Sequence, residues 1–179
     1  MLLLTSLAAA ALWTATPAAE LQTAPRSTPA PQAAPSDESL ERIQKRLMQN
    51  PAIRLDKQPV PGGSGKTTFR VRVDAPALTV DQIFGPDFLK GPVPATGMTH
   101  QEFLDLVTPK DVSGYAAFTN KEGITVALTS TALNVALKEA LEAWRRAKDE
   151  RAREAARMEV EDAVAALRAA RRDPGQSPK

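Results

Sequence analysis

Apolar residues in the middle of the chain follow two different spacings. From Phe69 to Val73 every second residue is apolar, which is typical of a strand with one buried face. A weaker alternation begins at Ile53. The connection between the two runs, residues 59–67, is rich in glycine, so we expect a β-hairpin there.

A second hairpin is expected further along the chain. Residues 115–119 and 124–129 are rich in apolar and β-branched residues, and they flank the turn Asn120-Lys-Glu-Gly123. The glycine can take the positive φ that such a turn requires. The two hairpins together predict a small four-stranded sheet.

Shorter helices are expected around the hairpins. Leu40, Ile43 and Leu47 have the spacing of one helix face, and Ser36 can cap the start of that helix. Two further starts match the capping box, in which side chains three residues apart satisfy each other's backbone N–H groups. These starts are Thr79 with Gln82, and Thr99 with Glu102.

The last long segment, residues 131–172, contains neither proline nor glycine and is dominated by Ala, Leu, Arg, Glu and Lys. These residues favour helix, so we expect one continuous helix that Asp173-Pro174-Gly175 ends. The whole chain then predicts an α+β fold. It would have a small, mainly antiparallel sheet of two hairpins, helices on one face and a long charged C-terminal helix.

The apolar stripe of this long helix changes sides. Leu133, Leu137 and Leu141 share one face, while the stripe after residue 154 lies roughly opposite at about 100° per residue. We therefore expect the first half to pack on the body. The second half projects, or bends back near Asp149, and presents its stripe to a partner or a second copy. The predicted partner-binding residues are Val160, Val164 and Leu167.

The N-terminal segment is typical of an exported protein. Residues 1–19 combine an apolar run of about a dozen residues with a small-residue cleavage site, as in a signal peptide. Such a run is shorter than the roughly 20 residues of a membrane span, so no stable span is expected after leader cleavage. The predicted domains are a signal peptide (1–19), a Pro/Ala-rich disordered linker (20–36), an α+β body (37–144), the long helix (131–172) and a disordered tail (173–179).

Composition narrows the chemistry. The chain has 179 residues, no cysteine and a net charge of +2. The absence of cysteine excludes disulfides, thiol catalysis and thiolate metal sites. Acidic residues alternate with the arginines of residues 145–172, so no basic face for nucleic acid is expected.

Two motifs suggest catalysis but lack its context. Gly65-Lys66-Thr67 resembles the end of a phosphate-binding loop, yet Val60 stands where that motif needs glycine, and a strand follows instead of a helix. His100 is the single histidine, which gives little basis for a metal site or a triad. We therefore expect no catalytic, cofactor-binding or metal-binding residues.

The resulting hypothesis is an exported protein, periplasmic or secreted, that is not an enzyme. It would act in protein–protein interaction or structure through its long C-terminal helix, by binding a protein partner or a second copy, with some coiled-coil character. The alternative is a small exported hydrolase or small-ligand-binding module that uses the glycine-rich loop and the middle region. A pocket with converging polar groups would favour the alternative.

Overall fold

The computed structural model describes the chain from residue 34 to residue 172, with gaps. The predicted leader, the predicted tail and nearly all of the predicted linker lie outside the described residues, as does the glycine-rich loop with Lys66. The described segments are residues 34–61, 67–91, 93, 95–108 and 114–172.

The sheet consists of two hairpins joined side by side. Strand β1 (Arg54–Pro61) pairs antiparallel with β2 (Thr67–Asp74), and β3 (Tyr115–Thr119) pairs antiparallel with β4 (Thr125–Thr129). The strand order is β1-β2-β4-β3. This confirms the predicted α+β class and both hairpins.

The contact between the hairpins differs from the expected antiparallel pattern. Strands β2 and β4 run parallel, with Arg70 opposite Thr125 and Val73 opposite Leu128, so the sheet is mixed. The hydroxyl of Thr129 donates a hydrogen bond of 2.8 Å to Asp74 and ties the ends of the two strands together. A parallel pair needs a crossover connection, which here contains two helices and β3.

The helices before and within the crossover begin where the sequence predicts. Ser36 caps α1 (Asp37–Leu47) by accepting a hydrogen bond from the backbone N–H of Ser39. Both capping boxes are present, at the starts of α2 (Val80–Lys90) and α3 (His100–Val107). Inside α2 the backbone is kinked at Gly85, whose φ of 71° is accessible to glycine.

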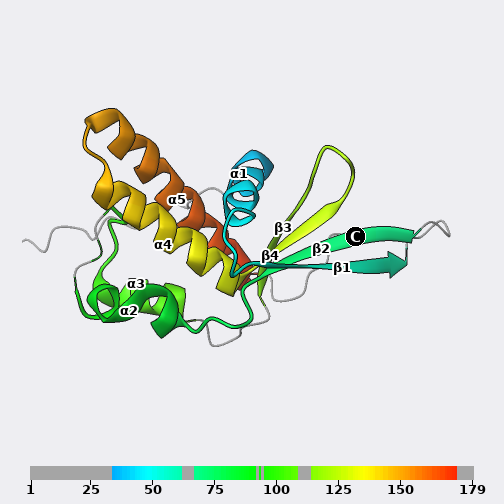
Figure 1. The fold of residues 1–179 in the computed structure, drawn as a ribbon, viewed down its shortest axis with the longest axis horizontal. Helices are drawn as coiled ribbons and strands as arrows, with labels where there is room; N and C mark the ends of the chain where they lie inside the picture. The colour runs from blue at the N-terminus through cyan, green and yellow to red at the C-terminus, as the bar shows by residue number, and fades with distance from the viewer. Residues whose placement is uncertain (1–33, 62–66, 92, 94, 109–113, 173–179) are drawn as a thin grey trace, which may run out of the picture. The chain divides into compact units, whose positions relative to one another are not determined.

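The predicted continuous C-terminal helix is wrong, because the chain forms two helices. Helix α4 (Ser130–Arg146) ends before Ala147, whose ψ of 122° is not helical, and α5 (Glu150–Arg172) begins three residues later. Asp149 starts the second helix, since its carboxylate accepts a hydrogen bond of 2.7 Å from the backbone N–H of Ala152. Figure 1 shows the two helices side by side, forming a helical hairpin.

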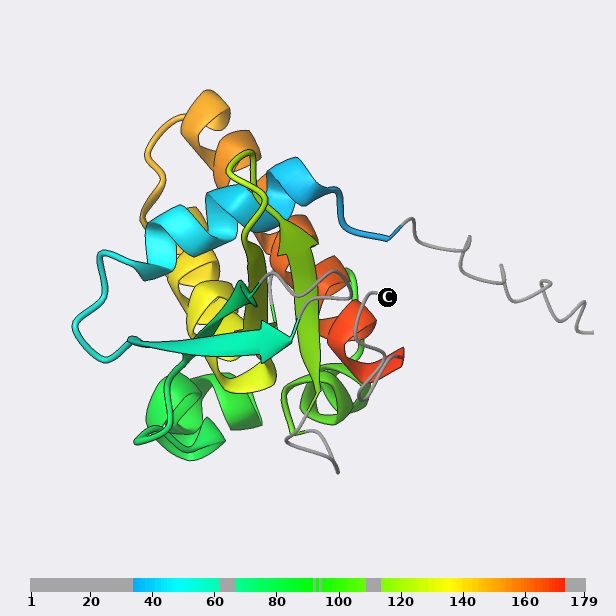
Figure 2. The same ribbon diagram turned by 90° about the vertical axis from the view of Figure 1, so that its right-hand side faces the viewer.

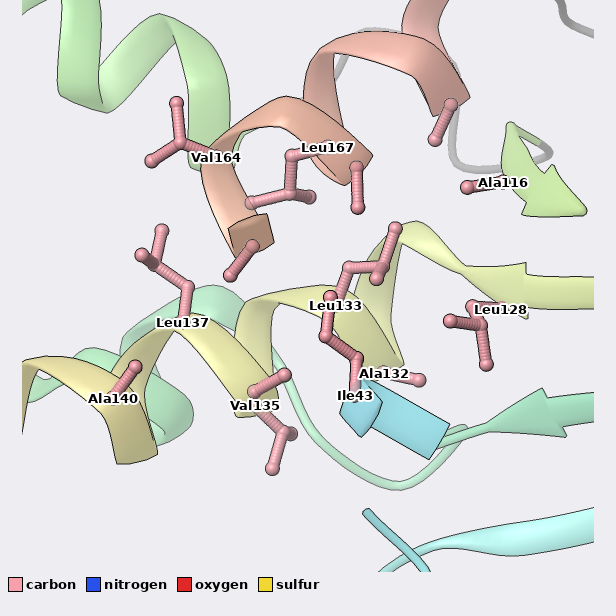
Figure 3. Packing of buried hydrophobic residues seen from close by; sticks show 14 of the residues in the cluster. Ile43, Ala116, Leu128, Ala132, Leu133, Val135, Leu137, Ala140, Val164 and Leu167 are labelled. Atoms are coloured by element: carbon pink, nitrogen blue, oxygen red, sulfur yellow. The ribbon is translucent and has the colours of Figure 1, made fainter. Parts of the chain in front are cut away.

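Of the two arrangements expected for the second half of this segment, projection is wrong, and the bend back near Asp149 is confirmed. Val160, Val164 and Leu167 are 0%, 5% and 1% exposed and belong to the core. Val164 and Leu167 lie close to Leu133 and Leu137 of α4 (Figure 3). The apolar stripes of the two halves would lie on opposite sides of one straight helix. Because the chain turns back on itself at residues 147–149, both stripes face the same core.

The helices cover one face of the sheet, as predicted. Helices α1, α4 and α5 contact the strands, and Figure 2 shows the sheet in front of α4 and α5. The buried side chains of the covered face belong to the hydrophobic core, whereas Ala127, on the opposite face of β4, does not. The covered face is formed by Val73, Ala116, Phe118, Val126 and Leu128.

Candidate functional site

Strand β3 forms one edge of the sheet and has an unusual composition for an edge. Its sequence, YAAFT, contains neither a charged residue nor a proline. Ala116 and Phe118 point into the core, so the strand is firmly held on that side. Natural proteins usually protect such edges with charge, proline or a covering segment, because unpaired peptide groups can bind another strand.

Hydrogen bonds at both ends of β3 fix which of its peptide groups face outward. The carbonyl of Gly114 accepts from the N–H of Ser130 at 3.1 Å, and the N–H of Asn120 donates to Ile124 at 3.0 Å. In an antiparallel pair the direction of the peptide groups alternates along the strand, so even-numbered residues bond β4. The odd-numbered residues therefore direct their N–H and C=O groups away from the sheet. These residues are Tyr115, Ala117 and Thr119.

Among the described residues, no hydrogen bond joins the outward backbone groups of Tyr115, Ala117 or Thr119 to any other element. Tyr115 and Ala117 are partly exposed, and Thr119 is exposed. The N–H and C=O groups of these three alternate residues therefore form a short row that can hydrogen-bond to an added strand.

Two helix ends flank this edge (Figure 2). At the end of β3, a groove of about 620 Å³ separates Thr119 from the first turns of α1, where Asp37, Glu38 and Glu41 lie. At its start, Gly114 lies against the last turns of α5, so closely that a Cβ there would sit 2.3 Å from the carbonyl oxygen of Ala170. Arg42, Lys45 and Lys121 line the same groove, so acidic and basic side chains are equally numerous there, and the last turn of α5 adjoins the other end of the edge.

The opposite edge of the sheet is different. Strand β1 carries Pro59 and Pro61 in its distal half. Proline has no N–H to donate, and within a sheet it is accommodated where its nitrogen faces outward from an edge. Strand β1 therefore offers fewer donors to an added strand than β3 does.

On the face of the sheet opposite the helices lies a small depression, the bowl, of about 130 Å³. Ala127 forms its floor, and the guanidinium of Arg70 lies 5.9 Å from the centre of the Tyr115 ring. The carboxylate of Asp74 forms an ion pair of 3.0 Å with the guanidinium of Arg72, which also lines the bowl. The remaining lining residues are Gln58 and Thr129.

A larger groove of about 630 Å³ lies at the tip of the helical hairpin. Trp144 is only partly buried and lines this groove, whereas Leu137 and Leu141, which were predicted to pack on the body, are fully buried. The guanidinium of Arg153 lies 5.8 Å from the Trp144 ring. Acidic and basic side chains alternate around the groove, so it has no clear preference for the charge of a ligand.

Of the residues considered from the sequence, Lys66 lies outside the described residues and His100 lies at the start of α3. The ring of His100 is hydrogen-bonded to the carbonyl of Gly91 at 3.1 Å. The predicted partner-binding stripe of Val160, Val164 and Leu167 is in the core, so in this fold it offers no surface to a partner. Within the described segments, no cluster of three or more histidine, aspartate or glutamate side chains could hold a metal ion.

None of the described helices is long and apolar enough to cross a membrane. Comparisons with protein-family models, with curated proteins and with solved structures find no match to this chain.

Sequence reasoning missed the β3 edge. The predicted strand was correct, but strand order decides which strands are edges, and alternation does not reveal that order. One signal was present in the sequence. The two prolines in β1 are compatible with an edge strand, so the other edge had to be one of the three remaining strands.

Proposed function

We propose that this protein is an exported, non-enzymatic interaction protein that binds an extended segment along the β3 edge. The observation that carries the proposal is the row of outward peptide groups at Tyr115, Ala117 and Thr119, in a strand with no proline and no charge. In such strand addition, main-chain hydrogen bonds supply affinity and neighbouring pockets supply specificity.

The energetics are those of a modest interaction. Each net hydrogen bond contributes about 0.5–1.5 kcal/mol, so a few main-chain bonds alone give weak binding. The groove beside Thr119 and α1 can add side-chain contacts. Since the edge is rigidly backed by the buried Ala116 and Phe118, little ordering of this surface opposes binding.

Peptide display with a counter-selection tests this binding mode. Random peptides would be selected on the full chain and then screened against Ala117→Pro, which removes an outward N–H while leaving the bonds to β4 intact. Ala117→Ser, which keeps that N–H, is the matched control. We expect selected peptides to bind the Ser variant and to lose binding to the Pro variant.

Amide hydrogen exchange gives the second readout. A bound strand should slow exchange at residues 115, 117 and 119, whereas 116 and 118 are already protected by β4. If no peptide depends on the N–H of Ala117, or if the protected amides lie elsewhere, strand addition at β3 is wrong.

Export is proposed from the sequence of residues 1–19, an apolar run followed by Pro17-Ala18-Ala19. We expect leader removal near Ala19. Mass spectrometry of the native protein, after fractionation of the cells, should find a mature N-terminus close to residue 20 outside the cytoplasm. An intact leader on cytoplasmic protein would contradict export.

The bowl on the open sheet face favours a second candidate function, the binding of a small anion. Arg70 and Arg72 lie two residues apart on β2, hence on one face of the sheet, and both line the bowl with Ala127. Phosphate and acetate titrations followed by NMR should shift the signals of these arginines, and Ala127→Leu should abolish the shifts by filling the bowl. Equal shifts in wild type and variant would exclude a defined site.

A further inference from the structure

We infer that the segment bound at the β3 edge is β3 of a second copy of this chain, which gives a two-fold symmetric dimer with a continuous sheet. This inference rests on the proposed strand addition and names the partner. A dimer of this kind is isologous, since each copy contributes the same surface.

Strand β3 is suited to antiparallel pairing with itself about Ala117. Ala117 then faces its own counterpart, and Tyr115 faces Thr119 of the other copy. All three odd-numbered positions direct their peptide groups outward, and each hydrogen-bonded pair exchanges two bonds. The three pairs would therefore form about six N–H···O bonds across the two-fold axis.

Side-chain sizes agree with this register. At the axis, the small side chain of Ala117 meets its copy on the open face of the sheet. On the covered face, Phe118 of one copy lies opposite Ala116 of the other. Each large side chain thus meets a smaller one, which permits close approach of the two strands without a charged group at the interface.

The helix ends beside β3 agree with the same symmetry. The first turns of α1, with Glu38 and Glu41, lie beside Thr119, and the last turn of α5 adjoins Gly114. Antiparallel pairing brings the start of one β3 to the end of the other. The groove of one copy, which is lined by both acidic and basic side chains, therefore approaches the last turn of its partner's α5 at each end of the interface.

The charges at the α5 end are shared with a neighbouring helix. Hydrogen bonds from Thr99 and, to a smaller extent, the charge of Arg168 lower the pKa of Glu102 in α3, while burial lowers the pKa of Arg171 despite the nearby carboxylate of Asp105. These charged groups already have neighbours within one copy, so hydrogen bonding along β3 is the main source of affinity in the dimer.

Single cysteines test the register, because the natural chain has none. In Ala117→Cys the two Cα atoms across the axis would be about 5.5 Å apart, within the range of a disulfide. In Thr119→Cys the two identical positions lie four residues apart along the strand, about 13 Å, which is too far. A mixture of Tyr115→Cys and Thr119→Cys should cross-link, whereas neither should cross-link alone.

Sedimentation equilibrium tests for the dimer without any cross-link. Wild type and Ala117→Ser should show twice the monomer mass at high concentration. Ala117→Lys places two like charges directly opposite each other at the axis and should raise the dimer dissociation constant at least tenfold. Circular dichroism would verify that the Lys variant is folded, as expected for a partly exposed edge position.

The outcomes separate this inference from the proposed function. Dimers that cross-link through residue 117 and dissociate in the Lys variant support both. A wild type that stays monomeric, or dimers insensitive to residue 117, overturns the second copy as the partner. Peptides that still require the N–H of Ala117 would in that case leave strand addition standing, and their absence would remove both.

Discussion

Replacing Leu167 by alanine tests whether the distal half of α5 is part of the core. The Leu167 side chain is 1% exposed, and the substitution removes three carbon atoms. At about 0.8 kcal/mol for each buried carbon, the lost transfer free energy is about 2.4 kcal/mol. A residual cavity adds to this, so we expect the free energy of unfolding to fall by about 3 kcal/mol, inside the usual range of about 2–5.

Urea unfolding followed by circular dichroism measures this change. With a slope of about 2 kcal/mol per molar urea, the midpoint should fall by about 1.5 M. Met158→Ala is the matched control, because Met158 lies on the same helix but is 50% exposed. Its effect should remain within about 0.5 kcal/mol. Equal stability of the two variants would refute the packing of α5 against α4.

Three further predictions concern contacts inside the fold. Gly114→Ala should lower the melting temperature or prevent folding, since its Cβ would sit 2.3 Å from a backbone oxygen of α5. Asn134→Ala should cost about 1–3 kcal/mol in urea unfolding, because the buried carbonyl of Val107 loses its 2.8 Å donor; a neutral effect would contradict that role. Hydrogen bonds from the backbone N–H and then the hydroxyl of Thr99 hold the pKa of Glu102 below its ordinary 4.5. The associated stability should be complete above that ordinary value and lost as the pH falls through the lowered pKa, which an NMR titration can follow.

Local features of the fold were predictable because they depend on neighbouring residues. The capping boxes at Thr79 and Thr99 need only two side chains at a spacing of three. The turn at Gly123, with a φ of 76°, likewise needs only a residue that tolerates positive φ. Both kinds of signal act within one turn of chain, so tertiary contacts did not override them.

The break of the C-terminal segment was predicted only as an alternative to a projecting second half, because it lacks the usual markers. Neither proline nor glycine interrupts residues 146–150, and Ala147 itself favours helix. The signal was Asp149, a preferred capping residue, together with the apolar stripe that changes sides around it. Helix propensity predicted continuity, whereas burial of two apolar faces against one core required a turn.

The parallel contact of β2 and β4 could not be predicted from periodicity. Alternation places Val71 and Val73 on one face but does not identify the neighbouring strand. Because periodicity does not identify neighbours, it did not show that β3 is an edge strand. For the same reason, Val160, Val164 and Leu167 were predicted to form a partner surface. These residues were correctly identified as an apolar stripe, but their partner is the core of the same chain.

The difference between the two sheet edges has a consequence for how far strand addition can continue. If both edges of a sheet could bind an added strand, copies of the chain could join end to end into an open filament. Here Pro59 and Pro61 weaken the β1 edge as an acceptor, while β3 pairs with its own copy and is then used up. Growth by this route stops at two chains, so the protein could present an unprotected strand without the hazard of fibre formation.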